Sequence, residues 1–254
     1  MLFHSTRGGD KNRTFEDILM QGLASDGGLF MPDFWPQVDL ESLANKSSFI
    51  DIAKEIVPLF TSSSFDDEVV LSILDNTWHD FAYEDIAPLK HLDSDMAVLE
   101  LFHGPTAAFK DFGLQLAAAF FNEVLTKNNK TAVVLGATSG DTGSAAIEAC
   151  KGRQNLDIVI LHPADRVSEV QRRQMTTVDS FNVHNVAVEG TFDDCQDMVK
   201  AMFNDLEFRN KLKLGAVNSI NWARVMAQIV YYVVASERLG SHDQPVIFSV
   251  PTGN

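Results

Sequence analysis

The chain has 254 residues, 45% of them hydrophobic, which is enough for one large globular domain or two smaller ones. Its 35 acidic and 20 basic residues give a net charge of −15, which argues against nucleic acid and anionic membrane surfaces as partners. An anionic ligand must therefore be held by a few local groups, because the overall field repels it. The two cysteines, Cys150 and Cys195, provide no disulfide framework and suit a reducing, cytoplasmic compartment.

Targeting, membrane and metal signals are weak. Residues 1–13 are polar and lack an apolar core, so we expect no secretion signal. The longest apolar stretch, residues 226–235, is interrupted by Gln228 and is too short to span a membrane. The histidines are scattered and the cysteines lie far apart, so we expect no metal site.

Residues 1–92 predict short helices joined by polar turns, and we expect them to form a separate N-terminal domain. Thr14 followed by Asp17 is a typical helix start, and apolar residues follow at helical spacing. Ser64 followed by Asp67 predicts a further helix start.

After about residue 95, apolar runs alternate with helical segments. The predicted strands are 97–101, 131–135, 156–161, 183–188 and 246–250, and the predicted helices are 112–127, 143–150, 168–175, 192–204 and 221–238. Continuous apolar strands between helices predict a three-layer α/β fold, with a parallel sheet covered on both faces. We assign this region to residues 93–254 and expect ligands at the carboxyl ends of its strands.

Lys110 lies between the predicted strand 97–101 and the predicted helix 112–127, in a loop of small and apolar residues. Phe109 and Phe112 flank it, and partial burial favours the neutral amine, which is the nucleophile that forms Schiff bases. The alternative is a solvated surface cation. The sequence thus predicts a reactive lysine at a strand-to-helix turn.

Residues 136–143 form a second loop of this kind, with three glycines, after a strand and at the start of a helix. Backbone N–H groups and the hydroxyls of such a loop make an anion site. Asp141 is unusual in a phosphate cradle, and its carboxylate suits a hydrogen bond from a ligand hydroxyl or iminium. The alternative is a glycine-rich turn with a Ser/Thr cap, and neither a dinucleotide nor a P-loop fingerprint is present.

A third loop begins at residues 250–254, directly after the predicted strand 246–250. A chain that stops straight after an apolar strand is unusual, so we expect it to continue beyond Asn254 in a longer protein.

Eight motifs in order along the chain resemble those of one enzyme family. They are STRG (5–8), GLA with DGGL (22–24 and 26–29), HGPTAAFKDFG (103–113), ATSGDTGSAA (137–146), QMTT (174–177), EGTFDDCQD (189–197), VNSINWAR (217–224) and VPTGN (250–254). The chain is similar to threonine synthases, which are pyridoxal-phosphate-dependent enzymes of the tryptophan-synthase-β fold type. The resemblance implies the branch that carries an extra N-terminal domain.

This resemblance implies roles for particular residues. Lys110 is implied as the Schiff-base lysine, and Asp141 as a neighbour of the cofactor's 3′-oxygen. Gly253 and Asn254 match the start of the loop that holds the cofactor phosphate. The segment that grips the substrate carboxylate is implied to comprise Thr138, Ser139, Gly140 and Thr142.

The VNSINWAR segment supplies candidate ligands for the substrate phosphate: Asn218, Ser219, Asn221 and Arg224. A structural role is equally open, because Asn218 and Ser219 can cap the following helix and Trp222 can belong to the core.

The resemblance implies conversion of O-phospho-L-homoserine and water to L-threonine and phosphate, with pyridoxal 5′-phosphate on Lys110. Two alternatives remain: a related phospho-lyase that eliminates phosphate and yields a 2-oxo acid, and an inactive fragment. The sequence indicates no oligomeric state.

Overall fold

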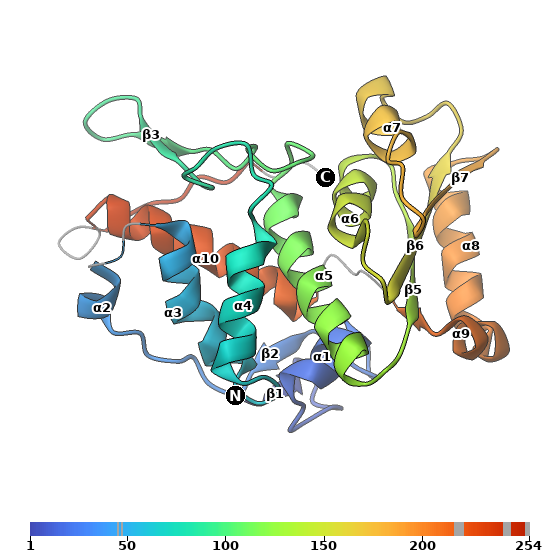
Figure 1. The fold of residues 1–254 in the computed structure, drawn as a ribbon, viewed down its shortest axis with the longest axis horizontal. Helices are drawn as coiled ribbons and strands as arrows, with labels where there is room; N and C mark the ends of the chain where they lie inside the picture. Colours follow the sequence, from blue (N-terminus) through green and yellow to red (C-terminus); the bar gives the residue numbers. More distant parts are fainter. Residues whose placement is uncertain (45, 47, 216–220, 241–244, 252–254) are drawn as a thin grey trace.

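The computed structural model describes residues 1–254 except 45, 47, 216–220, 241–244 and 252–254. Figure 1 shows a helical half beside a half built on a sheet. Helix α5 (Lys110–Lys127) lies between them and packs against both α10 (Trp222–Arg238) and α6 (Asp141–Cys150). The first turn of α5 is therefore held from two sides.

The first part of the chain forms a small antiparallel sheet and several helices. The strands are β1 (Phe3–Ser5) and β2 (Phe30–Pro32), and the helices are α1 (Phe15–Gln21), α2 (Leu40–Ala44), α3 (Phe49–Thr61) and α4 (Asp67–Thr77). The predicted start of α1 is confirmed: Thr14 Oγ1 accepts from the Asp17 amide at 3.2 Å, and Asp17 Oδ2 accepts from the Thr14 amide at 2.9 Å. The predicted start at Ser64 is wrong, since α4 begins at Asp67 with Asp66 as its N-cap.

The rest of the chain follows the predicted alternation closely. Its elements are β3 (Leu89–His91), β4 (Ala97–Leu99), α5, β5 (Ala132–Ala137), α6, β6 (Leu156–Pro163), α7 (Glu169–Thr176), β7 (Val183–Val188), α8 (Phe192–Asn204), α9 (Leu206–Leu212), β8 (Leu214–Gly215) and α10. The bounds of β7 and α8 match the prediction to the residue. The short elements β3, α9 and β8 were not predicted, because each is too short to show a period.

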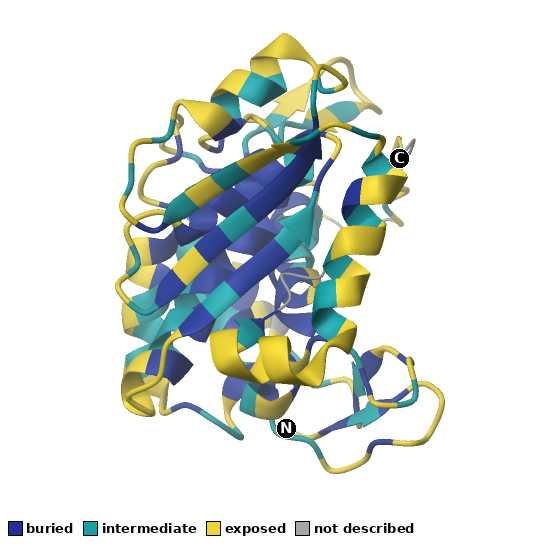
Figure 2. Cartoon of the chain, turned by 90° about the vertical axis from the view of Figure 1, so that its right-hand side faces the viewer, coloured by how far each residue is buried: buried dark blue, intermediate teal, exposed yellow. Residues whose placement is uncertain are grey.

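The predicted three-layer α/β fold is confirmed. Strands β5, β6, β7 and β8 form a parallel sheet in the order β7-β6-β5-β8. Helix α6 packs on one face, and α8 packs on the other through a small apolar cluster that contains Leu135, Leu161 and Cys195. Figure 2 shows that the central strands are mostly buried, whereas the edge strand β7 carries exposed residues. The continuous apolar runs of β5 and β6 follow from this burial on both faces.

Two predicted strands differ in the structure. Of the predicted strand 97–101, only Ala97–Leu99 form a strand, β4, which pairs with β3 in a separate antiparallel sheet and not with the parallel one. Residues 246–250 form no strand. Ile247 is 92% exposed, and the Phe248 ring lies 4.9 Å from that of Tyr232 on α10. An apolar run becomes a strand only where a neighbour pairs with its backbone, and among the described residues this segment has no such neighbour.

The start of α5 is anchored by an aromatic cluster around Phe112, which is fully buried. Its ring lies 5.6 Å from that of Phe49 on α3, 4.9 Å from Phe81 and 5.5 Å from Tyr231 on α10. Trp78 Nε1 also donates to the Phe112 carbonyl at 3.2 Å. Because large aromatic side chains bury much apolar area, this cluster fixes the backbone two residues after Lys110.

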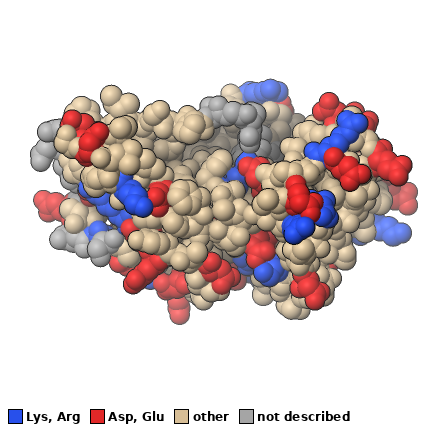
Figure 3. Space-filling model, turned by 90° about the horizontal axis from the view of Figure 1, so that it is seen from above, with Lys and Arg blue, Asp and Glu red and all other residues tan. Residues whose placement is uncertain are grey.

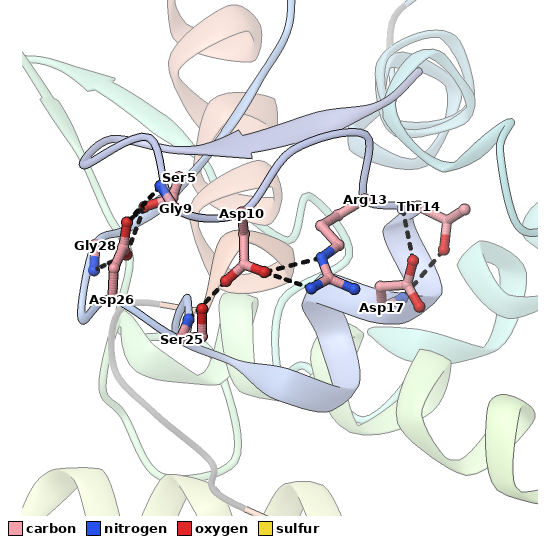
Figure 4. Close-up of polar contacts among 9 residues, drawn as sticks. All are labelled: Ser5, Gly9, Asp10, Arg13, Thr14, Asp17, Ser25, Asp26 and Gly28. Carbon is pink, nitrogen blue, oxygen red and sulfur yellow. Dashed lines mark hydrogen bonds and ion pairs between the residues drawn. The ribbon is translucent and has the colours of Figure 1, made fainter.

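The two N-terminal motifs fold onto each other, as Figure 4 shows. The Asp26 carboxylate accepts from Ser5 Oγ at 2.7 Å, from the Gly9 amide at 2.7 Å and from the Gly28 amide at 2.8 Å. The Asp10 carboxylate binds the Arg13 guanidinium and accepts from the Ser25 amide at 2.6 Å. These hydrogen bonds lower the pKa of both carboxyl groups, to about 2 for Asp10. The STRG and DGGL motifs therefore hold the loop after β1 against the loop before β2 through these hydrogen bonds.

Candidate functional site

Lys110 is the first residue of α5 and is only 6% exposed. Its Nζ donates to Asp141 Oδ2 at 2.7 Å and lies 5.4 Å from the centre of the Phe109 ring. The burial expected for this lysine is therefore present. Its partner comes from the next helix, 31 positions along the chain. The structure thus brings two of the four residues of the predicted cofactor site into contact.

Asp141 is the first residue of α6 and follows directly on the glycine-rich loop after β5. A carboxylate at a helix N-terminus is stabilised by the unpaired amides there. Its side chain is 40% exposed, whereas that of Lys110 is 6% exposed. Water and ligands therefore reach the ion pair from the Asp141 side.

The hydroxyl of Thr138 is used inside the loop. It accepts from the Gly140 amide at 3.1 Å and the Gly143 amide at 2.9 Å, and it donates to the Gly140 carbonyl at 3.1 Å. Thr138 is also 3% exposed. The Thr138 side chain therefore stabilises the fold of the loop. Only the backbone of Thr138 is left to contact a substrate.

Ser139 and Thr142 keep free donors. Neither hydroxyl forms a hydrogen bond with any described residue, and Ser139 is exposed. The backbone amides of Ser139, Asp141 and Thr142 likewise donate to no described residue. This loop therefore offers an anion two hydroxyls and three N–H groups. The motif in the sequence predicts these donors, but only the structure shows that they have no partner among the described residues.

The glycines of this loop are required by close packing. A Cβ at Gly140 would overlap the Gln171 side chain, and one at Gly143 would overlap Thr138 and meet Met175 Sδ at 2.9 Å. Gln171 and Met175 both belong to α7, which therefore lies directly against the loop. A side chain at Gly140 would have to displace that of Gln171, and one at Gly143 would have to displace Thr138 and Met175.

Arg224 is 2% exposed, at the start of α10. Its Nε and Nη1 atoms are buried, and neither has a hydrogen-bond partner among the described residues. Burial lowers the pKa of Arg224 to about 10, while the nearby Asp141 charge acts in the opposite direction. A Cβ on Gly113 of α5 would lie 3.2 Å from the Arg224 Cβ, so the helices touch there. Arg224 is thus a desolvated cation near the Lys110–Asp141 pair, with two unused donor atoms.

The remaining predicted site residues divide into two groups. Asn221 is the N-cap of α10: its Oδ1 accepts from the Ala223 amide at 3.0 Å, and its Nδ2 donates to the Leu19 carbonyl at 2.9 Å. Both ends of its side-chain amide form hydrogen bonds with the backbone, which favours the structural alternative for this residue. The residues Asn218, Ser219, Gly253 and Asn254 lie outside the described part of the chain.

Asp111 contributes to the site although the sequence reasoning missed it. It is fully buried, and its carboxylate accepts from the Thr106 amide at 2.9 Å and from Thr106 Oγ1 at 2.7 Å. Burial raises the pKa of Asp111, partly offset by these hydrogen bonds. A carboxylate next to the lysine, in an otherwise apolar motif, was the signal that could have identified it.

The surroundings of the site carry mixed charge. Figure 3 looks onto the end of the molecule where α5 and α6 begin, and its Lys and Arg side chains are interspersed with acidic ones. Among the described residues, no cluster of His, Cys, Asp or Glu could hold a metal ion. No helix in the described part of the chain is long and apolar enough to cross a membrane. Lys110 and Arg224 are therefore the local cations to which an anion at this site could bind.

Two family models match the chain. Residues 2–87 match the model described as threonine synthase N terminus, and residues 87–254 match the pyridoxal-phosphate dependent enzyme model. A threonine synthase from Pseudomonas aeruginosa is 52% identical over 100% of this chain and 55% of its own length. The crystal structure of pyridoxal-phosphate-bound threonine synthase from Brucella melitensis superimposes with a TM-score of 0.95 at 47% identity, covering 99% of this chain and 55% of that one. Yeast threonine synthase gives a TM-score of 0.88 at 42% identity, covering 93% and 50%.

The chain therefore belongs to the pyridoxal-phosphate-dependent enzyme family. Within it, the relatives that match along the whole chain include threonine synthases, so the resemblance recognised from the motifs is confirmed, as is pyridoxal phosphate as the family's cofactor. The chain spans about half the length of the relatives it matches.

Proposed function

We propose that the protein converts O-phospho-L-homoserine and water to L-threonine and phosphate, with pyridoxal phosphate carried on Lys110. The observation that supports this most strongly is the ion pair of the buried Lys110 with Asp141 beside Arg224, two of whose donor atoms have no hydrogen-bond partner among the described residues. Two cations, Lys110 and Arg224, therefore lie near Asp141 in an otherwise acidic protein. Such a site suits a substrate that carries a carboxylate and a phosphate. We assign the protein to the cytoplasm, where its two free, buried cysteines stay reduced.

The residues fit the proposed cofactor. When bound, pyridoxal phosphate supplies an aldehyde that condenses with amines and a ring that withdraws electrons. Lys110 places a buried amine at the start of α5, where it can condense with that aldehyde, and Asp141 Oδ2 accepts from its Nζ at 2.7 Å. We assign Gly253 and Asn254 to the cofactor's phosphate by family resemblance.

Lys110 is also the proposed base for the substrate. A neutral amine held at the start of α5 can take a proton from one substrate carbon and return it to another. Proton transfer by a positioned group typically contributes ~10²–10⁴-fold to the rate. Asp141 is the group that would hold Lys110 in place between these transfers, since its carboxylate already accepts from Nζ.

The two anionic ends of the substrate have separate proposed partners. The loop from Thr138 to Thr142 would bind the carboxylate through its free N–H groups and the hydroxyls of Ser139 and Thr142. Arg224 would bind the phosphate, because a guanidinium pairs two donors with one phosphate. Asn218 and Ser219 remain proposed phosphate ligands from the same segment. Asn221 would act by capping α10, and so by holding Arg224.

The reaction is tested by supplying O-phospho-L-homoserine to the natural gene product and measuring threonine, 2-oxo acid and phosphate in parallel. We expect threonine and phosphate in equal amounts. Phosphate with a 2-oxo acid in place of threonine would support the alternative phospho-lyase. That alternative is kept because a protein named threonine synthase-like 2, from Xenopus laevis, is 40% identical over 100% of this chain. A Lys110→Ala variant should form neither product.

A further inference from the structure

Helix α7 contacts both loops of the proposed site. Gln174 Nε2 donates to the carbonyl of Thr106, in the lysine loop (residues 103–109), at 2.9 Å across 68 positions of sequence. On the same helix, Gln171 and Met175 pack against Gly140 and Gly143 of the loop that carries Asp141. One short helix thus joins the segment before Lys110 to the segment before Asp141.

The lysine loop is stiff enough to transmit a contact at Thr106 to Lys110. Thr106 is tied to Asp111 by the two hydrogen bonds given above, which bridge across Lys110. A Cβ at Gly104 would lie 2.5 Å from Asp111 Oδ2, so the loop folds tightly over that carboxylate. Ala107 has φ of 57°, a left-handed conformation that is costly for alanine and needs support from its surroundings. The loop and the first turn of α5 therefore form one unit.

Helix α7 is held independently of Gln174. Ser168 Oγ caps its N-terminus by accepting from the Gln171 amide, and Glu169 pairs with Arg172 and Arg173 on its surface. Near its end, Asn185 Nδ2 of β7 donates to the Met175 carbonyl at 2.9 Å. Loss of the Gln174 side chain would therefore remove the link to the lysine loop and leave the helix in place.

We propose that Gln174 is a positioning residue, which holds the lysine loop against α7 and so sets the distance between Lys110 Nζ and Asp141 for proton transfer. This inference rests on the proposed function, since it gives that site its geometry. Gln174 touches a backbone carbonyl and not the reacting atoms, so it acts only through Lys110. The QMTT motif, to which the sequence assigned no role, thereby gains one.

Three variants test the proposal. Gln174→Met keeps the volume of the side chain and removes the donor. Gln174→Glu places a carboxylate oxygen against the Thr106 carbonyl, which repels it. Arg173→Ala is the matched control on the same helix, because its side chain is 69% exposed and pairs only with Glu169. The first measurement is amide hydrogen exchange of residues 103–111 in the cofactor-free protein.

We expect the amides of Thr106 and Ala107 to exchange roughly three- to tenfold faster in Gln174→Met, as loss of one neutral hydrogen bond implies. Exchange of these amides should be faster still in Gln174→Glu, and in Arg173→Ala it should be as slow as in the parent protein. In the loaded enzyme, both Gln174 variants should lower kcat roughly ten- to a hundredfold, because reacting groups are misplaced. KM should change less than about twofold, since the substrate anions bind elsewhere.

Parent-like exchange and parent-like kcat in both Gln174 variants would overturn the proposal. So would a raised KM at unchanged kcat, which would make Gln174 a substrate ligand. A different experiment tests the proposed function. The parent protein is incubated with pyridoxal phosphate, reduced with borohydride and mapped by peptide analysis. If Lys110 is not labelled, the proposed function is wrong. The exchange measurement needs no cofactor and decides the link between α7 and the lysine loop in either case.

Discussion

Replacing Arg224 with methionine should stabilise the ligand-free protein while removing its response to phosphate. The guanidinium is 2% exposed, and two of its nitrogen atoms have no partner. Methionine keeps most of the apolar contacts of the arginine stem and needs no hydrogen bonds. The change therefore separates the cost of burying the charge from the cost of losing packing.

The expected gain follows from the pKa of Arg224, which burial lowers to about 10. An arginine ordinarily has a pKa of about 12.5, and each pH unit is worth about 1.4 kcal/mol, so the buried charge costs about 3 kcal/mol. Because the folded state binds this proton more weakly, the penalty is complete below pH 10 and disappears as the pH rises towards about 12.5. Burying two donors without partners costs about 1–3 kcal/mol for each donor, which is the same order of magnitude as the cost of the buried charge.

We therefore expect Arg224→Met to raise the free energy of unfolding near neutral pH by about 2–3 kcal/mol. For a chain of this length that corresponds to a Tm increase of roughly 4–12 °C. Thermal unfolding is followed in increasing inorganic phosphate, which should raise the Tm of the parent protein and not of the variant. Arg173→Met, at an exposed site, serves as the control. A fall in Tm for Arg224→Met, or equal stabilisation of both proteins by phosphate, would refute the reasoning.

Three further changes have defined outcomes. Lys110→Ala should abolish the visible absorbance of bound pyridoxal phosphate and leave the circular dichroism unchanged; retained absorbance with threonine formation would show that another lysine carries the cofactor. Asp141→Ala should lower turnover more than tenfold and shift the Tm by only a few degrees, because its carboxylate accepts from Lys110 Nζ and, among the described residues, from no amide at the start of α6; normal turnover with a much lower Tm would instead assign it to capping. The hydrogen bonds of Asp10, from Arg13 and then Ser25, hold its pKa at about 2, so their stabilisation is complete above about pH 4 and is lost as the pH falls towards 2. Urea unfolding at about pH 6 and about pH 3 should therefore show a flatter pH dependence for Asp10→Asn than for the parent, and parallel curves would contradict this assignment.

Much of the second half of the fold could be predicted because its signals are local. Helices show an apolar period of 3.6, so α8 was placed to the residue, and a strand buried on both faces is an unbroken apolar run, so the bounds of β5 and β6 were predicted to within two residues. The capping box that begins at Thr14 could likewise be predicted, because it depends only on residues 14–17. The segments that failed, 97–101 and 246–250, carry the same apolar signal as true strands of the sheet. Whether such a segment joins the sheet depends on which other strand lies beside it. That depends on residues far away in the sequence.

The sequence by itself determined the order of most elements of the second half, the family motifs and the position of one lysine in an apolar loop, because each depends on neighbouring residues. Only the tertiary structure decided that Lys110 contacts Asp141, that Arg224 is buried with free donors beside them, and that Thr138 and Asn221 use their polar groups internally. Burial and hydrogen-bond partners are set when segments far apart in the chain pack together. The sequence can therefore identify candidate groups, and packing determines which of them are free to bind a ligand.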